Sequence, residues 1–98
     1  FTGGRFSAAD AETMGLVNRV VPVAELESRV TVLATTIAEN APMTVKAAKA
    51  AINEGTKNPD DRELDRVAAM VEACFNSDDY KEGRRAFMEK RKPQFQGK

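Results

Sequence analysis

The stretch SDDYKEGRRAFMEKRKP at residues 77–93 is the most informative part of this 98-residue chain. Ser77 is a good N-cap for a helix over about residues 78–91, and Pro93 limits any further helix. Gly83 lies inside that helix, where glycine costs about 1 kcal/mol relative to alanine. Close approach of another backbone at Gly83 would explain the cost. One side of the helix combines apolar and basic side chains, namely Tyr80, Arg84, Phe87, Met88 and Arg91.

Phe87 and Lys90 are the candidate binding pair of this helix. They are three residues apart, so an aromatic ring and an ammonium group are expected to point the same way. A nucleotide offers matching features, because a base can stack on the ring for about 1–3 kcal/mol and a phosphate can accept from the lysine. The alternative is a core phenylalanine beside a lysine that reaches solvent, and spacing alone favours this simpler interpretation.

Charge is distributed unevenly, although 15 basic and 15 acidic residues cancel over the whole chain. Residues 84–98 hold six basic side chains against Glu89 alone, so this segment carries +5 and the first 83 residues carry −5. The overall balance argues against nucleic acid as a partner. The basic end suggests contact with an anionic group, or a solvated helix end that the helix dipole favours.

Two helices and a short extended segment are expected in the first 40 residues. Ser7 and Asp10 have the spacing of a capping box for a helix over residues 8–14, which Gly15 should end. A second helix is expected over about residues 24–40, where apolar residues recur at steps of three and four. Between them lies a brief β-like stretch that ends at Pro22 and contains Leu16, Val17, Val20 and Val21.

Two more helices are expected before the last one. Pro42 suits the first turn of a helix over residues 42–54, whose several alanines permit close packing. Acidic residues then place negative charge on the first turns of a fourth helix, where the dipole favours it: Asp60, Asp61, Glu63 and Asp65. The chain is therefore expected to be mainly α, with about five helices and one short β-like stretch.

Composition removes several kinds of active site. The chain has no histidine and one cysteine, which excludes a Ser-His-Asp triad, a Cys-His pair and an internal disulfide. The acidic run lacks the spacing of a calcium loop, so no metal site is predicted. No two glutamates have environments that would push their pKa values apart, so no residue is assigned a catalytic role. No apolar run approaches the ~18 residues that span a bilayer, which argues against a membrane partner.

The core is expected to be thin. Five modest helices with five Phe and one Tyr supply few large apolar groups. We infer that some apolar surface is buried against material outside the chain, either upstream sequence or another subunit. The lone Cys74 is expected to act as a small buried apolar residue. With no visible targeting signal, a reducing cytoplasmic location is expected.

Three ordered blocks of sequence carry a family resemblance over nearly the whole chain. They are FTGGRFSAADA at residues 1–11 with GLVNRVVP at residues 15–22, the Ala-Pro and Ala/Lys-rich helix of residues 41–49, and residues 77–93. Together they resemble the C-terminal third of the crotonase (enoyl-CoA hydratase/isomerase) family. Complete members resemble a spiral of ββα repeats followed by C-terminal helices that build trimers, often paired into hexamers. The resemblance implies one incomplete domain over residues 1–98, with residues 1–24 at the edge of an absent core and residues 25–98 forming a helical oligomerisation region.

The family chemistry implies what this chain lacks. Two backbone N–H groups form an oxyanion hole for an acyl-CoA thioester enolate, and one or two glutamates act as acid and base. In a hydratase these groups add water across the 2,3 double bond of an enoyl-CoA. By the family pattern all of them lie upstream of Phe1, so the chain is expected to be inactive alone, with no permanently bound cofactor.

One functional pair does carry over by resemblance. In hydratases of this family, a Phe and a Lys in an Ala-Phe-x-Glu-Lys-Arg segment contact the 3′-phosphoadenosine end of CoA bound to a neighbouring subunit. Residues 86–91 match that segment, which assigns those contacts to Phe87 and Lys90. The expected partners are therefore other subunits and acyl-CoA. The alternative is an autonomous helical protein-interaction module that does not bind CoA.

Overall fold

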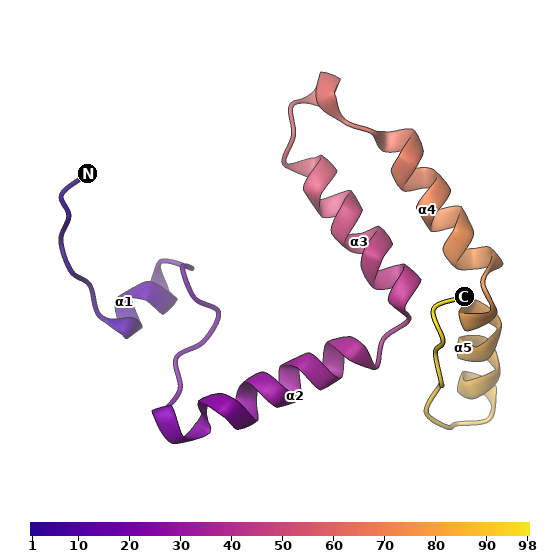
Figure 1. Cartoon of the computed structure of the whole chain (residues 1–98), viewed down its shortest axis with the longest axis horizontal. Helices are drawn as coiled ribbons and strands as arrows, with labels where there is room; N and C mark the ends of the chain where they lie inside the picture. The colour runs from indigo at the N-terminus through magenta and orange to yellow at the C-terminus, as the bar shows by residue number, and fades with distance from the viewer. The chain divides into compact units, whose positions relative to one another are not determined.

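The computed structural model describes all 98 residues and contains helices but no strands (Figure 1). The prediction of a mainly α chain with about five helices is confirmed. The chain divides into two compact units, Phe1–Val32 and Leu33–Lys98. Its helices are α1 (Ala8–Thr13), α2 (Leu26–Ala38), α3 (Pro42–Gly55), α4 (Leu64–Asn76) and α5 (Asp78–Met88), with short 3₁₀ turns at Val23–Glu25 and Pro59–Asp61.

Helix α1 begins and ends as its sequence predicts. The Ser7 hydroxyl accepts from the Asp10 backbone N–H at 3.1 Å, and the Asp10 carboxylate accepts from the Ser7 backbone N–H at 3.0 Å. These two bonds complete the capping box. The Ser7 hydroxyl also donates to the Asp10 carboxylate at 2.6 Å, and this bond, followed by the one from the Ser7 N–H, holds the pKa of Asp10 below its ordinary value. At the other end Gly15 adopts a φ of +76°, and Leu16 N–H donates to the Ala11 carbonyl at 2.9 Å. This is the left-handed cap that glycine favours.

The β-like stretch predicted between Leu16 and Val21 is wrong. These residues form bends and irregular backbone, and the Val20 N–H donates at 3.2 Å to the Glu12 carboxylate rather than to a strand. The physical reason is that a strand is defined by its ladder of hydrogen bonds with a neighbour. No other strand exists in this chain, so an extended apolar segment has nothing to pair with.

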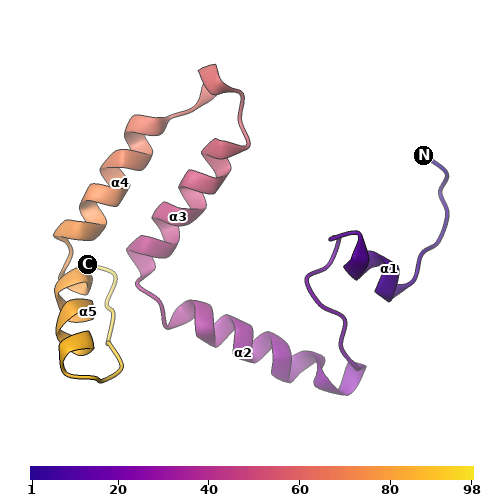
Figure 2. The same cartoon turned by 180° about the vertical axis from the view of Figure 1, so that it is seen from behind.

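Helices α3 and α4 run side by side in opposite directions, as both views show (Figure 1, Figure 2). Their connection is held by Glu54, which is 2% exposed. Its carboxylate accepts from Lys57 Nζ at 2.9 Å and from the Glu63 backbone N–H at 2.9 Å. The Glu63 hydrogen bond and then the Lys57 contact keep the pKa of Glu54 below its ordinary value. Glu54 is therefore a structural carboxylate that joins the end of α3 to the start of α4.

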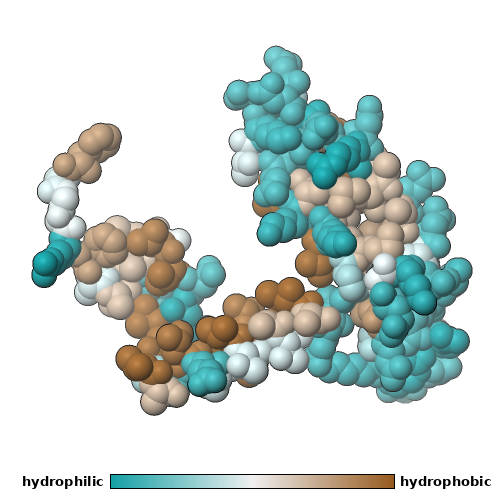
Figure 3. Space-filling model, in the orientation of Figure 1, coloured by the Kyte–Doolittle hydropathy of each residue, from teal (hydrophilic) through white to brown (hydrophobic).

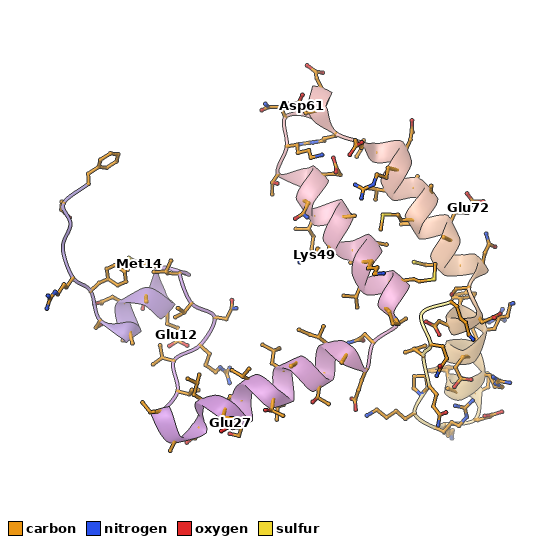
Figure 4. The ribbon with its side chains drawn as sticks, in the orientation of Figure 1. Glu12, Met14, Glu27, Lys49, Asp61 and Glu72 are labelled. Carbon is orange, nitrogen blue, oxygen red and sulfur yellow. The ribbon has the colours of Figure 1, made fainter.

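The predicted start of α4 is too early. Asp60 and Asp61 lie in the separate 3₁₀ turn, and α4 itself begins at Leu64 (Figure 4 labels Asp61 in the turn). Arg62 interrupts the helix because its backbone is extended and its guanidinium Nε donates to the Lys57 carbonyl at 3.2 Å. Only Glu63 and Asp65 of the acidic run lie where the dipole of α4 can favour them.

The chain buries very little apolar surface of its own. Only three apolar residues are buried, and all are alanines: Ala11, Ala47 and Ala86. The apolar stripe predicted along α2 exists but is more than half exposed, and the space-filling view shows hydrophobic colour along that helix (Figure 3). Its members are Leu26, Val30, Leu33 and Ile37. Cys74, expected to be buried, is half-buried.

Candidate functional site

Helix α5 ends three residues earlier than predicted, and this changes how Phe87 and Lys90 are related. The helix stops at Met88. Lys90 takes a φ of +53°, its N–H donates to the Phe87 carbonyl at 3.2 Å, and the Arg91 N–H donates to the Ala86 carbonyl at 3.0 Å. This pair of bonds is the helix-ending motif in which glycine usually holds the left-handed position. Lys90 therefore lies in the cap rather than on the helix face.

The side chains of Phe87 and Lys90 are both exposed in this chain. The Phe87 side chain is 82% exposed, so the interpretation as a core phenylalanine fails within this chain. Lys90 is exposed, and its ammonium group has no carboxylate or hydrogen-bond partner within the chain. An open aromatic face and an unpaired cation are thus held together at the end of α5.

Most of the basic side chains near Lys90 already form salt bridges with carboxylates. Arg85 pairs with Glu82 at 2.8 Å, Arg91 pairs with both Glu82 and Glu89 at 2.6 Å, and Lys92 pairs with Glu39 at 2.5 Å. The guanidinium of Arg84 lies 6.0 Å from the centre of the Tyr80 ring. The net +5 of residues 84–98 therefore overstates the positive charge available to a ligand, and Lys90 is the uncommitted cation of the turn.

The C-terminal tail, residues 92–98, folds back along α5 (Figure 1). Asp79 is 3% exposed, and its carboxylate accepts from the backbone N–H groups of Gln96 at 2.6 Å and Gly97 at 2.8 Å. The Asp79 N–H in turn donates to the Lys98 carbonyl at 3.1 Å. These three bonds tie the last residues of the chain to the first turn of α5.

The tail also explains what lies against Gly83. A Cβ added at Gly83 would meet the ring of Phe95 at 3.5 Å, which is an ordinary packing distance. The neighbour is therefore an aromatic side chain, and the expected approach of another backbone is not seen. The glycine is not required by space within this chain.

Glu82 connects the helix, the cap and the tail. Its carboxylate accepts from Arg91 through two nitrogens at 2.6 and 3.0 Å, from Arg85 at 2.8 Å, and from the Gln94 backbone N–H at 3.0 Å. The side chain is only 12% exposed. Hydrogen bonds from Arg91, then Arg85, then Gln94 place the pKa of Glu82 far below its ordinary value. Glu82 is thus ionised at neutral pH, and its carboxylate binds groups of Arg85, Arg91 and Gln94, on both sides of Lys90 in the sequence.

A mostly apolar groove of about 670 Å³ lies beside this site, between α3, α4, α5 and the tail. Phe75 and Tyr80 meet edge to face in it with ring centres 5.2 Å apart, and Phe87 and Phe95 also line it. Its carboxylate, Asp79, is already used by the tail. No group of His, Cys, Asp or Glu side chains could hold a metal ion anywhere in the chain. The groove can accept apolar groups, but it offers no acid–base pair.

Sequence reasoning named Phe87 and Lys90 but missed the residues that hold them. Asp79 was readable only as an acidic residue in the first turn of a helix, where the dipole favours it, and Glu82 only as one of several glutamates with no assigned role. Apart from Arg85, three residues from Glu82, the side-chain hydrogen bonds of these two carboxylates reach residues 9 to 18 positions away along the chain. No periodic pattern reports such contacts, so no sequence signal could have found them.

The family model described as enoyl-CoA hydratase/isomerase matches residues 1–98. The chain belongs to this family. The methylmalonyl-CoA decarboxylase of Escherichia coli (strain K12) is 39% identical over 101 residues, covering 99% of this chain and 38% of the relative. The short-chain-enoyl-CoA hydratase of Clostridium acetobutylicum is 39% identical over 92 residues, covering 94% and 35%.

Solved structures give the same result. A probable enoyl-CoA hydratase/isomerase from Mycobacterium abscessus matches with a TM-score of 0.87 at 29% identity, covering 99% of this chain and 38% of that one. The enoyl-CoA hydratase from Bacillus anthracis matches with a TM-score of 0.78 at 35% identity and the same coverage. The chain therefore spans little more than a third of the length of these relatives. None of its helices has both the length and the apolar composition that crossing a membrane requires.

Proposed function

We propose that this chain is the C-terminal helical part of an enoyl-CoA hydratase/isomerase-type enzyme, and that it supplies one wall of the CoA site of a neighbouring subunit. Phe87 and Lys90 contact the 3′-phosphoadenosine end of the thioester. The observation that carries this proposal is the turn after α5, where an 82% exposed ring and an unpaired ammonium group are joined by the Lys90–Phe87 backbone hydrogen bond.

The chemistry of the two side chains suits that ligand. The adenine ring can stack on Phe87, a contact worth about 1–3 kcal/mol per base. Lys90 can donate to the 3′-phosphate as a compact charge, and charge-assisted hydrogen bonds are roughly twice as strong as neutral ones. Because Arg85, Arg91 and Lys92 already have carboxylate partners, Lys90 takes the phosphate contact.

The rest of the chain provides subunit contacts. Residues 1–24 form the edge of a core that the remainder of the enzyme supplies, and residues 25–98 form a helical region for assembly into trimers or hexamers. Support comes from burial, since three alanines are the only buried apolar residues while the stripe of α2 is open to solvent. A chain with so little core is a poor candidate for an autonomous module.

In the enzyme that we propose, water adds across the 2,3 double bond of an enoyl-CoA, a lyase reaction. The acid, the base and the oxyanion hole lie outside these residues, so CoA thioester is a substrate here and the 98 residues alone are inactive. The single unpaired cysteine is in keeping with a reducing compartment such as the cytoplasm.

The first test is hydration of crotonyl-CoA by the isolated 98-residue chain, followed by loss of the enoyl thioester absorbance. We expect no activity. Hydration at a rate comparable with that of complete family members would refute the proposal.

The second test uses the intact enzyme with Phe87→Ala and Lys90→Ala. Each should raise KM for crotonyl-CoA by about tenfold, the size of one stacking or charge-assisted contact, with a smaller change in kcat. Lys81→Ala is the matched control, because Lys81 is an exposed lysine of the same helix that already pairs with Asp78 at 2.7 Å. If the control raised KM as much as Lys90→Ala, the ligand contact would not be specific to the turn.

A further inference from the structure

Lys90 holds a backbone conformation that lysine does not favour. Its φ of +53° lies in the left-handed region, which costs an L-residue free energy unless the surroundings enforce it. The residues on either side are both tied down, since Glu89 and Arg91 bond to each other at 2.6 Å and Arg91 bonds to Glu82 at 2.6 Å. The turn is therefore held by its own Glu89–Arg91 pair and by Glu82, which lies outside the turn on α5.

Glu82 is the centre of those contacts. It lies on α5, nine residues before Arg91, and it accepts from the guanidinium of Arg91 in the cap and from the backbone N–H of Gln94 in the tail. The two-nitrogen contact with Arg91 sets direction as well as distance. Arg91 also donates to the Lys92 carbonyl at 3.2 Å. The contacts of Glu82 and Arg91 therefore hold the chain on both sides of Lys90 and leave its ammonium group unpaired.

We propose that Glu82 is a positioning residue for CoA binding, which acts through Arg91 and the tail to hold Lys90 where its ammonium group meets the 3′-phosphate. This inference rests on the function proposed above. In this role an acidic residue favours the binding of a polyanion. The negative charge of Glu82 is paired with Arg91 and Arg85, and its contacts hold the turn in place.

The direction in which Glu82→Gln changes the affinity for CoA separates a positioning role from a simple electrostatic one. Glu82→Gln in the intact enzyme removes a negative charge near a polyanionic ligand, so Coulomb interaction alone should tighten binding. Positioning instead requires weaker binding, by about five- to tenfold in Kd for CoA, the equivalent of one lost hydrogen bond. Glu72→Gln is the matched control, because Glu72 is exposed on α4 and points away from α3 (Figure 4).

A second variant covers the case in which Glu82→Gln does not fold. Arg91→Lys keeps the positive charge but loses the two-nitrogen contact, and it should weaken CoA binding to a similar extent. The double variant Glu82→Gln/Arg91→Lys should bind CoA no more weakly than Glu82→Gln alone, because both substitutions break the Glu82–Arg91 contact. Both single variants should leave the affinity for 3′-dephospho-CoA nearly unchanged, whereas a merely structural role would weaken both ligands alike.

The outcomes of this experiment are distinguishable. Unchanged or tighter CoA binding by Glu82→Gln and Arg91→Lys, while Lys90→Ala weakens it, overturns the positioning role and leaves the proposed function standing. No effect of Lys90→Ala itself overturns the proposed function and the inference with it. Equal losses for CoA and 3′-dephospho-CoA overturn the positioning role alone.

Discussion

The backbone N–H of Lys90 donates to the carbonyl oxygen of Phe87 at 3.2 Å. This bond makes the two candidate ligand contacts part of a single helix cap, so their relative position is set by the backbone and not by two independent side chains. A base and a phosphate on the same ligand need a fixed separation, which such a cap can supply. The same arrangement predicts that lysine at position 90 lowers the stability of the fold while it strengthens CoA binding.

Lys90→Gly should make the chain more stable and the CoA site weaker. Glycine adopts a φ near +53° without the penalty of a Cβ, so we expect the free energy of unfolding to rise by about 1 kcal/mol. The loss of the ammonium group should weaken CoA binding at the same time. Thermal unfolding and CoA titration of the intact enzyme measure the two effects.

Lys90→Ala is the control for that substitution. Alanine also removes the charge but keeps the Cβ, so it should weaken CoA binding as much as glycine does without the gain in stability. If the glycine and alanine variants had the same stability, the left-handed backbone of Lys90 would carry no strain. The surrounding contacts would then not be forcing Lys90 into an unfavourable conformation.

Asp79→Asn should loosen the C-terminal tail. The asparagine side chain cannot accept from both the Gln96 and the Gly97 N–H groups with two oxygens, so at least one bond is lost. We expect faster amide hydrogen exchange at Gln96 and Gly97 and a loss of about 1–2 kcal/mol in local stability. Exchange rates that match the unmodified chain would show that the Asp79 carboxylate does not hold the tail.

Gly83→Ala should be tolerated or stabilising. The added Cβ would sit 3.5 Å from the Phe95 ring, and alanine is the better helix former by up to about 1 kcal/mol. The measurement is the midpoint of thermal unfolding of this chain. A fall in stability in the intact enzyme, but not in the isolated chain, would reveal a close contact at Gly83 from outside these residues.

Acid should destabilise the fold below about the ordinary glutamate pKa. Hydrogen bonds from Arg91 to Glu82, and from the Glu63 N–H to Glu54, keep both pKa values below the ordinary 4.5. Because the folded state binds these protons less readily than the unfolded state, their stabilising contribution is complete above pH 4.5 and is lost as pH falls through the folded values. The unfolding temperature should therefore drop on acidification, and less steeply in a Glu54→Gln/Glu82→Gln variant. An equally steep drop in that variant would assign the effect to other carboxylates.

The parts of this structure that were predictable from sequence are those set by neighbours a few residues away. The Ser7–Asp10 capping box and the Gly15 stop follow from local backbone chemistry, and both are found where expected. The start of α4 was placed too early because acidic residues favour a helix start but cannot report that Arg62 is drawn to the Lys57 carbonyl.

The candidate site also has residues that the sequence could identify and residues that it could not. Phe87 and Lys90 could be named because a resemblance matched their segment, yet the end of α5 was placed three residues late. A lysine in the left-handed cap position has no sequence signature, since glycine or asparagine usually holds it. The roles of Glu82 and Asp79 depend on the tail returning along the helix, which is a tertiary contact.

The most direct test compares the binding of CoA and 3′-dephospho-CoA by the intact enzyme and its Lys90→Ala variant. We expect the variant to lose about tenfold in affinity for CoA and little for the dephosphorylated ligand, because the ammonium group contacts the 3′-phosphate. Equal losses for the two ligands, or no loss for either, would remove Lys90 from the site and contradict the role that we assign to the end of this chain.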